Sequence, residues 1–182
     1  MQQDLRERQG LAGAVAGVDA VVHCAASMHG DIRTQLALTV EGTRNLLDAM
    51  KQAGVAHIIG LGTFALYDYL RITAGSVLDE DSPLEEHFET RAPYIQVKRR
   101  QEDMIREYSL TNRWRWTILR PSIVFGGGRT WFHHLGMQLS PRRWLCLAGD
   151  SPLPLTYVEN CAAAILDALE TDAANGTTRD LT

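Results

Sequence analysis

Short runs of apolar residues recur along the chain, separated by longer segments that mix apolar and polar positions. The runs at 17–26 (GVDAVVHCAA), 55–61 (VAHIIGL) and 116–119 (WTIL) are largely apolar and contain several β-branched residues. Strands that are buried on both faces of a parallel sheet have this pattern. The sequence therefore predicts three buried strands.

The segments between these runs show helical spacing. Residues 35–51 place apolar side chains near one helix face, and Gly54 follows where a C-terminal cap belongs. A second helix is predicted over 93–108, because Pro93 suits a first helical turn. A third is predicted over roughly 158–170.

Strands that alternate with helices fold into a parallel sheet with right-handed crossovers. The predicted fold class is therefore α/β, a Rossmann-like doubly wound parallel sheet. Residues 67–91, rich in Gly, Ser, Pro and acidic residues, are expected to be mostly loop, and glycines 126–128 to form a turn.

Composition narrows the class of partner. The chain has 182 residues, 45% hydrophobic and 22% charged, with a formal net charge of −4. Nucleic acid is not expected as a partner, because phosphate binding needs a concentrated basic face. No apolar run approaches the roughly 18 residues of a membrane span, and the polar opening MQQDLRERQG does not resemble a signal peptide. We expect a cytoplasmic protein that binds a small-molecule substrate and no membrane.

Cysteine and histidine positions give no metal-binding pattern. Cys24, Cys146 and Cys161 lie far apart without CxxC spacing, which suits a reduced compartment. His133 and His134 are adjacent, and neighbouring side chains do not share a helix face. No metal site is expected.

Sites in parallel sheets lie at the carboxyl ends of the strands. The first predicted strand ends in the small residues Cys24, Ala25, Ala26 and Ser27, which let a flat ligand approach the backbone or else permit tight helix packing. The second ends at Thr63, whose hydroxyl serves either a substrate or, as is commoner for a lone Thr, a turn or helix cap.

Tyr94 and Lys98 stand four residues apart in the second predicted helix, so their side chains share a face. A free phenol has a pKa near 10 and is a poor base at neutral pH. A nearby ammonium favours the phenolate, which can then exchange a proton with a substrate hydroxyl or carbonyl. A Thr hydroxyl aimed at the same oxygen would stabilise its developing charge.

Seven segments follow one another in the order of motifs from one known family. They are Asp4-Leu5, VVHCAA at 21–26, VEGTRNLL at 40–47, Thr63 with Tyr67, Tyr94-x-x-x-Lys98, LRPSIVFGGG at 119–128 and TYVENCAAAI at 156–165. On these residues the chain resembles the extended short-chain dehydrogenase/reductases, also called NAD-dependent epimerase/dehydratases. Any one motif is weak evidence, whereas seven in order are specific.

The resemblance implies hydride transfer between NAD or NADP and a secondary alcohol or ketone. It implies Thr63, Tyr94 and Lys98 as catalytic residues, and a homodimer that pairs through helices 35–51 and 93–108. The residues it implies around the cofactor are Asp4, Leu5, Cys24, Ala25, Ala26, Ser27, Thr39, Tyr94, Lys98, Pro121 and Ser122. It divides the chain into a partial Rossmann domain, 1–125, and a substrate-binding region with a returning helix, 126–182.

Departures from the family pattern matter as much. The phosphate-binding GxxGxxG is absent, Thr39 stands for an Asn, Phe125 for a Tyr and Gly127 for a Pro. Without the strand that carries GxxGxxG, the first predicted strand keeps an unpaired edge, which proteins tolerate poorly. We therefore expect an incomplete piece of a longer reductase. The alternative is a truncated, non-catalytic module that binds dinucleotide or a partner chain.

Arginine and aromatic side chains follow the third predicted strand. They are Arg129, Trp131, Phe132, His133, His134, Arg142, Arg143 and Trp144. The arginines could clamp the diphosphate of a nucleotide-sugar, and the aromatic rings would suit a sugar or a steroid- or isoprenoid-like face. Packing of a lid with solvated arginines is an equally good interpretation.

Overall fold

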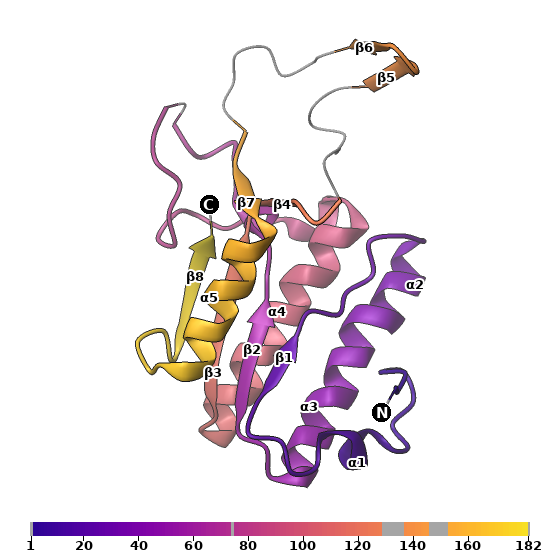
Figure 1. Cartoon of the computed structure of the whole chain (residues 1–182), viewed down its shortest axis with the longest axis vertical. Helices are drawn as coiled ribbons and strands as arrows, with labels where there is room; N and C mark the ends of the chain where they lie inside the picture. The colour runs from indigo at the N-terminus through magenta and orange to yellow at the C-terminus, as the bar shows by residue number, and fades with distance from the viewer. Residues whose placement is uncertain (1, 74, 129–136, 146–152, 182) are drawn as a thin grey trace.

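The computed structural model describes residues 2–73, 75–128, 137–145 and 153–181. Its main sheet has four parallel strands in the order β1 (Val21–His23), β2 (His57–Leu61), β3 (Arg115–Pro121) and β8 (Thr177–Leu181). Figure 1 shows these strands side by side, with helices on both faces. The predicted α/β class with a parallel sheet is confirmed.

The two faces of the sheet follow from the two-residue alternation of the strands. Ile58 and Ile118 face one hydrophobic cluster, to which α3 (Gly42–Ala53) and α4 (Pro93–Asn112) contribute. Ile59 and Leu119, one residue further along each strand, face a second cluster under α5 (Val158–Glu170). Apolar residues on both faces explain why the strands read as continuous apolar runs.

Shorter elements surround this sheet. They are α1 (Leu11–Val15), α2 (Ile32–Gln35), the π-helical segment η1 (Leu36–Glu41), the 3₁₀ turns η2 (Phe64–Leu66) and η3 (Phe88–Thr90), and the strands β4 (Ile123–Phe125), β5 (Met137–Ser140), β6 (Arg143–Leu145) and β7 (Leu155–Tyr157). β4 pairs with β7 in parallel, and β5 with β6 as an antiparallel hairpin. The hairpin lies apart from the sheet in Figure 1.

Predicted and observed boundaries differ at several places. The first strand, predicted over 17–26, is three residues long, because residues 17–20 precede it as turn and loop and residues 24–26 follow it without strand pairing. The helix predicted over 93–108 continues to Asn112 and ends at Arg113, which has the left-handed φ of 58°. The helix predicted over 35–51 is α3 with η1 and α2 before it.

Strand β8 was not predicted at all. Its residues TTRDL are mostly polar, so the strand lacks the apolar run by which the other three were recognised. It belongs to the main sheet although it lies within 126–182, and the division of the chain at residue 125 stays a prediction.

One edge of the main sheet is open within the part of the chain that the structure describes. There β1 pairs with β2 alone, and Val22 on β1 is 40% exposed. An unpaired edge next to the first strand is what the sequence predicted. Within these same described residues, no helix is long and apolar enough to span a membrane, and no three His, Cys, Asp or Glu side chains lie close enough together to hold a metal ion.

Candidate active site

Thr63 lies directly after β2, at the carboxyl end of the sheet. It is buried, and its Oγ1 accepts a hydrogen bond from the backbone N–H of Ala65 at 3.3 Å, so that it caps η2. Gly62, just before it, donates its N–H to the Leu119 carbonyl at 2.6 Å. A Cβ on Gly62 would lie 3.0 Å from the Arg120 side chain and 3.1 Å from the Glu102 carboxylate, so a larger residue would push on these neighbours.

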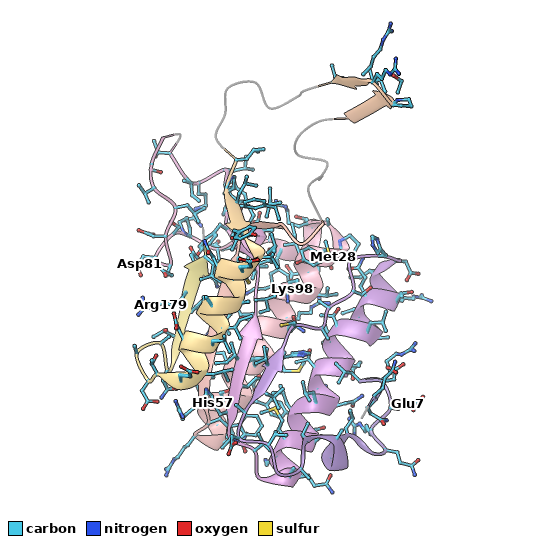
Figure 2. All side chains as sticks on the ribbon, in the orientation of Figure 1. Glu7, Met28, His57, Asp81, Lys98 and Arg179 are labelled. Atoms are coloured by element: carbon cyan, nitrogen blue, oxygen red, sulfur yellow. The ribbon has the colours of Figure 1, made fainter. Side chains whose placement is uncertain are left out.

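Tyr94 and Lys98 lie on successive turns at the start of α4, where Pro93 occupies the first turn. Lys98 is buried, and its Nζ donates to the backbone carbonyl of Leu61 at 2.5 Å and to Oε1 of Gln101. Leu61 precedes Thr63 by two residues, so Lys98 is fixed against the strand end that carries the threonine. Figure 2 shows Lys98 near that end of the sheet, with His57 at the opposite end of β2.

Burial lowers the pKa of Lys98 to about 8, although the charges of Glu102 and Cys24 act in the opposite direction. The amine is therefore mostly an ammonium at neutral pH and loses its proton at mildly alkaline pH. An ammonium with this pKa can both favour a nearby phenolate and donate hydrogen bonds to hydroxyl groups.

The segment after β1 exposes small residues, as its composition suggested. The Cys24 and Ala25 residues are exposed overall, and partial desolvation of the Cys24 thiol raises its pKa. The backbone N–H of Ser27 donates to Oγ1 of Thr39 at 2.9 Å. Thr39 is fully buried in η1, so it acts on this loop through Ser27, and its predicted contact with the cofactor stays a prediction.

Asp4 and Leu5 lie against α3. Asn45 donates its side-chain amide to the Leu5 carbonyl at 2.9 Å, and a Cβ on Gly42 would meet the Leu5 Cβ at 3.1 Å. The Arg6 guanidinium and backbone N–H hold the pKa of the exposed Asp4 carboxyl at about 2. Asp4 and Leu5 are therefore held next to the VEGTRNLL segment by contacts of Leu5 with Asn45 and Gly42.

Pro121 ends β3, Ser122 follows it, and both are buried. The Ser122 backbone N–H and hydroxyl both meet Oγ1 of Thr156, at 3.0 and 2.7 Å, which joins β3 to β7. Near them a cavity of about 440 Å³ is lined by Phe125, Leu155, Thr156, Tyr157, Asn160, Asp180 and Leu181. Polar and aromatic side chains therefore line an open space beside the ends of β3 and β8.

A buried polar cluster that the sequence did not predict surrounds Lys98. The His23 Nε2 lies 2.7 Å from Oγ1 of Thr43, and Gln101 Nε2 donates to the Ala25 carbonyl at 3.0 Å. Burial, with the nearby charge of Lys98, lowers the pKa of His23 to about 4. A polar residue three positions after Lys98, on the same helix face, was the available signal for Gln101.

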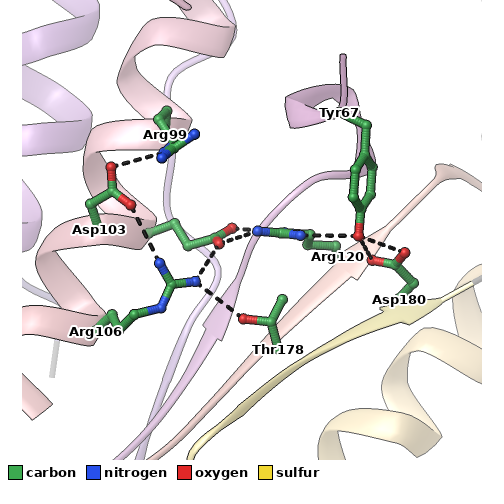
Figure 3. A network of polar contacts seen from close by, with 8 residues as sticks. Tyr67, Arg99, Asp103, Arg106, Arg120, Thr178 and Asp180 are labelled. Atoms are coloured by element: carbon green, nitrogen blue, oxygen red, sulfur yellow. Dashed lines mark hydrogen bonds and ion pairs between the residues drawn. The ribbon is translucent and has the colours of Figure 1, made fainter. Parts of the chain in front are cut away.

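Glu102 begins a second buried network, drawn in Figure 3. Its carboxylate contacts the guanidinium groups of Arg120 and Arg106. Arg120 also donates to the Tyr67 hydroxyl at 3.0 Å, which in turn donates to both carboxylate oxygens of Asp180, at 2.9 and 2.8 Å. Burial, followed by the bond to Asp180, raises the pKa of Tyr67. Its hydroxyl therefore stays protonated.

Most of the predicted arginine and aromatic group lies outside the described residues. Arg129, Trp131, Phe132, His133 and His134 are among those not described, as is Cys146. Arg142 and Arg143 are exposed on the β5–β6 hairpin. The choice between a substrate clamp and a lid therefore stays open.

Comparison with known proteins assigns the chain to a family. The model of the NAD dependent epimerase/dehydratase family matches residues 1–181. The N-acetyl-alpha-D-glucosaminyl-diphospho-ditrans,octacis-undecaprenol 4-epimerase of Escherichia coli O157:H7 is 32% identical over 180 residues, 94% of this chain and 51% of that protein. The 2-alkyl-3-oxoalkanoate reductase of Stenotrophomonas maltophilia (strain K279a) is 28% identical over 181 residues, 92% of this chain and 51% of that protein. The chain spans about half the length of these two relatives.

Solved structures agree on the fold. RMD from Pseudomonas aeruginosa, complexed with NADPH, matches with a TM-score of 0.81 at 21% identity, over 100% of this chain and 66% of that one. The Rossmann-like fold is therefore confirmed, and so, at the level of the family, is the expectation of NAD or NADP. The chain belongs to the NAD-dependent epimerase/dehydratase family.

Proposed function

We propose that this chain carries the catalytic residues of an NAD(P)-dependent oxidoreductase or epimerase that acts on a secondary alcohol or ketone. One observation supports this most directly. Lys98, one helical turn after Tyr94, is hydrogen-bonded to the end of the strand that leads into Thr63. This bond supports the proposal that Thr63, Tyr94 and Lys98 act on one substrate oxygen at the end of the sheet.

Each of the three has a distinct role. Tyr94 takes the proton of a substrate hydroxyl during oxidation and returns it to the carbonyl oxygen during reduction. Lys98 stabilises the phenolate by its charge. Thr63 donates its hydroxyl to the same substrate oxygen, since its bond with Ala65 uses the oxygen only as an acceptor. A bound nicotinamide supplies the position that accepts or donates hydride.

The residues present fit such a cofactor. Lys98 uses two of its three N–H groups in the bonds to Leu61 and Gln101, and these bonds leave the third to donate to a ribose hydroxyl. Cys24 and Ala25 are small and exposed, so a flat ring can approach the backbone there. Asp4, Ser27, Pro121 and Ser122 complete the proposed cofactor contacts by resemblance.

The proposed substrate class is a nucleotide-sugar or a steroid- or isoprenoid-like alcohol or ketone. The cavity near Ser122 supports it, because Asn160 and Asp180 can bind hydroxyl groups while Phe125 and Tyr157 offer ring faces. The related epimerase and reductase named above act, by their names, on a lipid-linked sugar and on an oxoalkanoate. A homodimer through α3 and α4 is part of this proposal.

The second candidate is a non-catalytic module that binds dinucleotide or a partner chain. The open edge of β1 favours it, because an unpaired strand edge can recruit another strand. Fluorescence titration of the 182-residue chain with NADH and NADPH is the first test. No saturable signal would mean that the chain is not a working enzyme, whereas a chain that binds the dinucleotide saturably without turnover would be the non-catalytic module.

Replacement of Tyr94 tests the chemistry. Tyr94→Phe should reduce turnover by about 100-fold or more, because general acid–base catalysis typically contributes this much. The dissociation constant for NADH should stay within about twofold, since the phenol acts on the substrate oxygen. Turnover is measured as NADH oxidation with a 3-ketosteroid, a 3-oxoalkanoate and a 4-keto nucleotide-sugar.

Tyr69→Phe is the matched control. Tyr69 is exposed and donates its hydroxyl to the backbone carbonyl of Phe64 in η2; the backbone bonds of η2 and the Thr63 cap remain without it, so its loss should leave turnover unchanged. Near-normal turnover in Tyr94→Phe would remove Tyr94 from its assigned role.

A further inference from the structure

Gln101 occupies a central place in the buried cluster beside Lys98. Its side chain is 2% exposed, and its Oε1 accepts a hydrogen bond from the Lys98 ammonium. Its Nε2 lies 3.0 Å from the Ala25 carbonyl, 2.9 Å from Oγ1 of Thr43 and 3.0 Å from Nε2 of His23. One amide therefore joins the lysine of α4 to the end of β1.

Counting hydrogens fixes the direction of these bonds. The Thr43 hydroxyl donates to the Thr39 carbonyl at 2.6 Å, so its oxygen is left to accept. With this direction, the His23 Nε2, 2.7 Å away, carries the hydrogen and donates to the Thr43 oxygen. The two hydrogens of Gln101 go to Ala25 and Thr43, so the hydrogens of Gln101, Thr43 and the His23 Nε2 each have an acceptor.

The opposite orientation of the Gln101 amide would leave hydrogen-bonding groups without partners. It would turn the NH₂ group toward the Lys98 ammonium, donor against donor, and leave the carbonyl oxygen facing the Ala25 carbonyl. A buried polar group without a partner costs about 1–3 kcal/mol. The surrounding groups thus hold the glutamine in one orientation, and the glutamine holds Lys98.

We propose that Gln101 is a positioning residue, which fixes the Lys98 ammonium relative to the Ala25 backbone through its two ends. This rests on the proposed function, in which Lys98 serves Tyr94 and the cofactor while Ala25 lines the cofactor. The amide spans from α4 to β1, so the lysine and the cofactor-lining segment move together. Because the amide is neutral, Lys98 can still lose its proton, whereas a carboxylate at this position would stabilise the charged ammonium.

The chain offers an unusually direct measurement, because Lys51 and Lys98 are its only lysines. Labelling lysine with ¹³C and ¹⁵N therefore gives two side-chain signals, and the exposed Lys51 serves as an internal reference. Gln101→Met removes both hydrogen-bonding ends at similar volume. We expect the titration midpoint of Lys98 to fall below its wild-type value, because the ammonium loses an acceptor, and NADH to bind about tenfold more weakly.

Gln101→Glu separates the two ends of the side chain. Its carboxylate can still accept from Lys98, so the titration midpoint of Lys98 should rise above the wild-type value. It cannot donate to the Ala25 carbonyl, so the weakened binding of NADH should persist. Gln96→Met is the control on the same helix, since Gln96 donates to the Arg91 carbonyl; both readouts should match the wild type.

The results divide cleanly. If Gln101→Met leaves both the Lys98 midpoint and NADH affinity unchanged in a folded protein, the positioning role is overturned. A hydrogen on Nδ1 rather than Nε2 of His23, read from long-range ¹⁵N–¹H couplings, would also contradict the bond directions. If the wild type binds no NADH, the proposed function fails for this chain, while the lysine titrations still decide whether Gln101 positions Lys98.

Discussion

Gln101 and Glu102 are neighbours on α4, yet they lead into buried networks of opposite character. The Gln101 network is built on a neutral amide and reaches β1 through Ala25 and His23. The Glu102 network is ionic and reaches β3 through Arg120, and from there Tyr67 and Asp180 (Figure 3). Successive residues of a helix point about 100° apart, so adjacent side chains serve different neighbours.

The difference shows where this fold keeps a fixed charge and where it does not. Around Glu102, the guanidinium groups of Arg106 and Arg120 both contact the one carboxylate, so the buried charges of Glu102 and Arg120 persist inside the protein. Around Gln101, the single amine of Lys98 meets uncharged acceptors, and burial brings its pKa to about 8. The ionic network joins α4 to β3 through Glu102 and Arg120. The neutral network allows Lys98 to lose its proton near pH 8.

The largest expected effect comes from breaking the ionic network. Glu102→Gln should destabilise the protein by about 3–5 kcal/mol, because Arg120, 3% exposed, would remain charged without its counter-ion. Urea unfolding followed by circular dichroism measures the loss. The double variant Glu102→Met with Arg120→Met should recover much of it, since paired apolar residues leave no buried charge.

Asp103→Asn is the matched control for that measurement. Asp103 is the next residue on α4, and its ion pairs with Arg99 and Arg106 are partly exposed. Exposed pairs contribute about 0–1 kcal/mol. Equal losses in Glu102→Gln and Asp103→Asn would mean that the buried carboxylate has no special structural role.

The neutral network should reveal itself through pH. The folded pKa of His23 is about 4, below its ordinary value of 6.5, because burial and the charge of Lys98 disfavour the imidazolium. Between these values the unfolded chain binds the extra proton, so stability is complete above pH 6.5 and falls as pH drops toward 4. The loss attributable to His23 should be about 3 kcal/mol.

His23→Gln tests this by urea unfolding at pH 6.5 and pH 4.5. The variant should lose less stability over that interval than the wild type, because the titrating imidazole is gone. The exposed His29, replaced in the same way, should leave the pH dependence as it was. A His23→Gln curve parallel to that of the wild type would show that His23 titrates normally in the folded protein.

The smallest effect concerns the far end of α4, away from both networks. Arg113 caps the helix with a φ of 58°, a conformation that glycine adopts without strain. Arg113→Gly should therefore stabilise the protein by about 0.5–1 kcal/mol in thermal unfolding. This variant shows how much a change at the end of α4, outside both networks, alters the stability of the protein. A destabilised variant would mean that the Arg113 side chain makes contacts which outweigh the strain.

The sequence revealed the fold wherever burial leaves a simple pattern. The strands that contain Ile58 and Ile118 are covered on both faces, so their apolar runs were recognisable. Strand β8 is polar and pairs along only one side within the described chain, so no such run marked it. Spacing and motif placed Lys98 on a helix beside Thr63, whereas Gln101 went unnoticed, because its role depends on groups up to 78 residues away in the chain.

The π-helical segment η1 makes the exact number of residues between 36 and 41 important for the structure. A π-helical turn holds one residue more than the α-helical turn it replaces, and η1 carries Thr39, which binds the loop after β1. Deleting a single residue between 36 and 41 would convert this wide turn to regular α-helix while the residues before and after it stay in phase. Thr39 lies inside the wide turn, so its hydroxyl would no longer be held where it supports Ser27, and deletions in this stretch should be less tolerated than conservative substitutions.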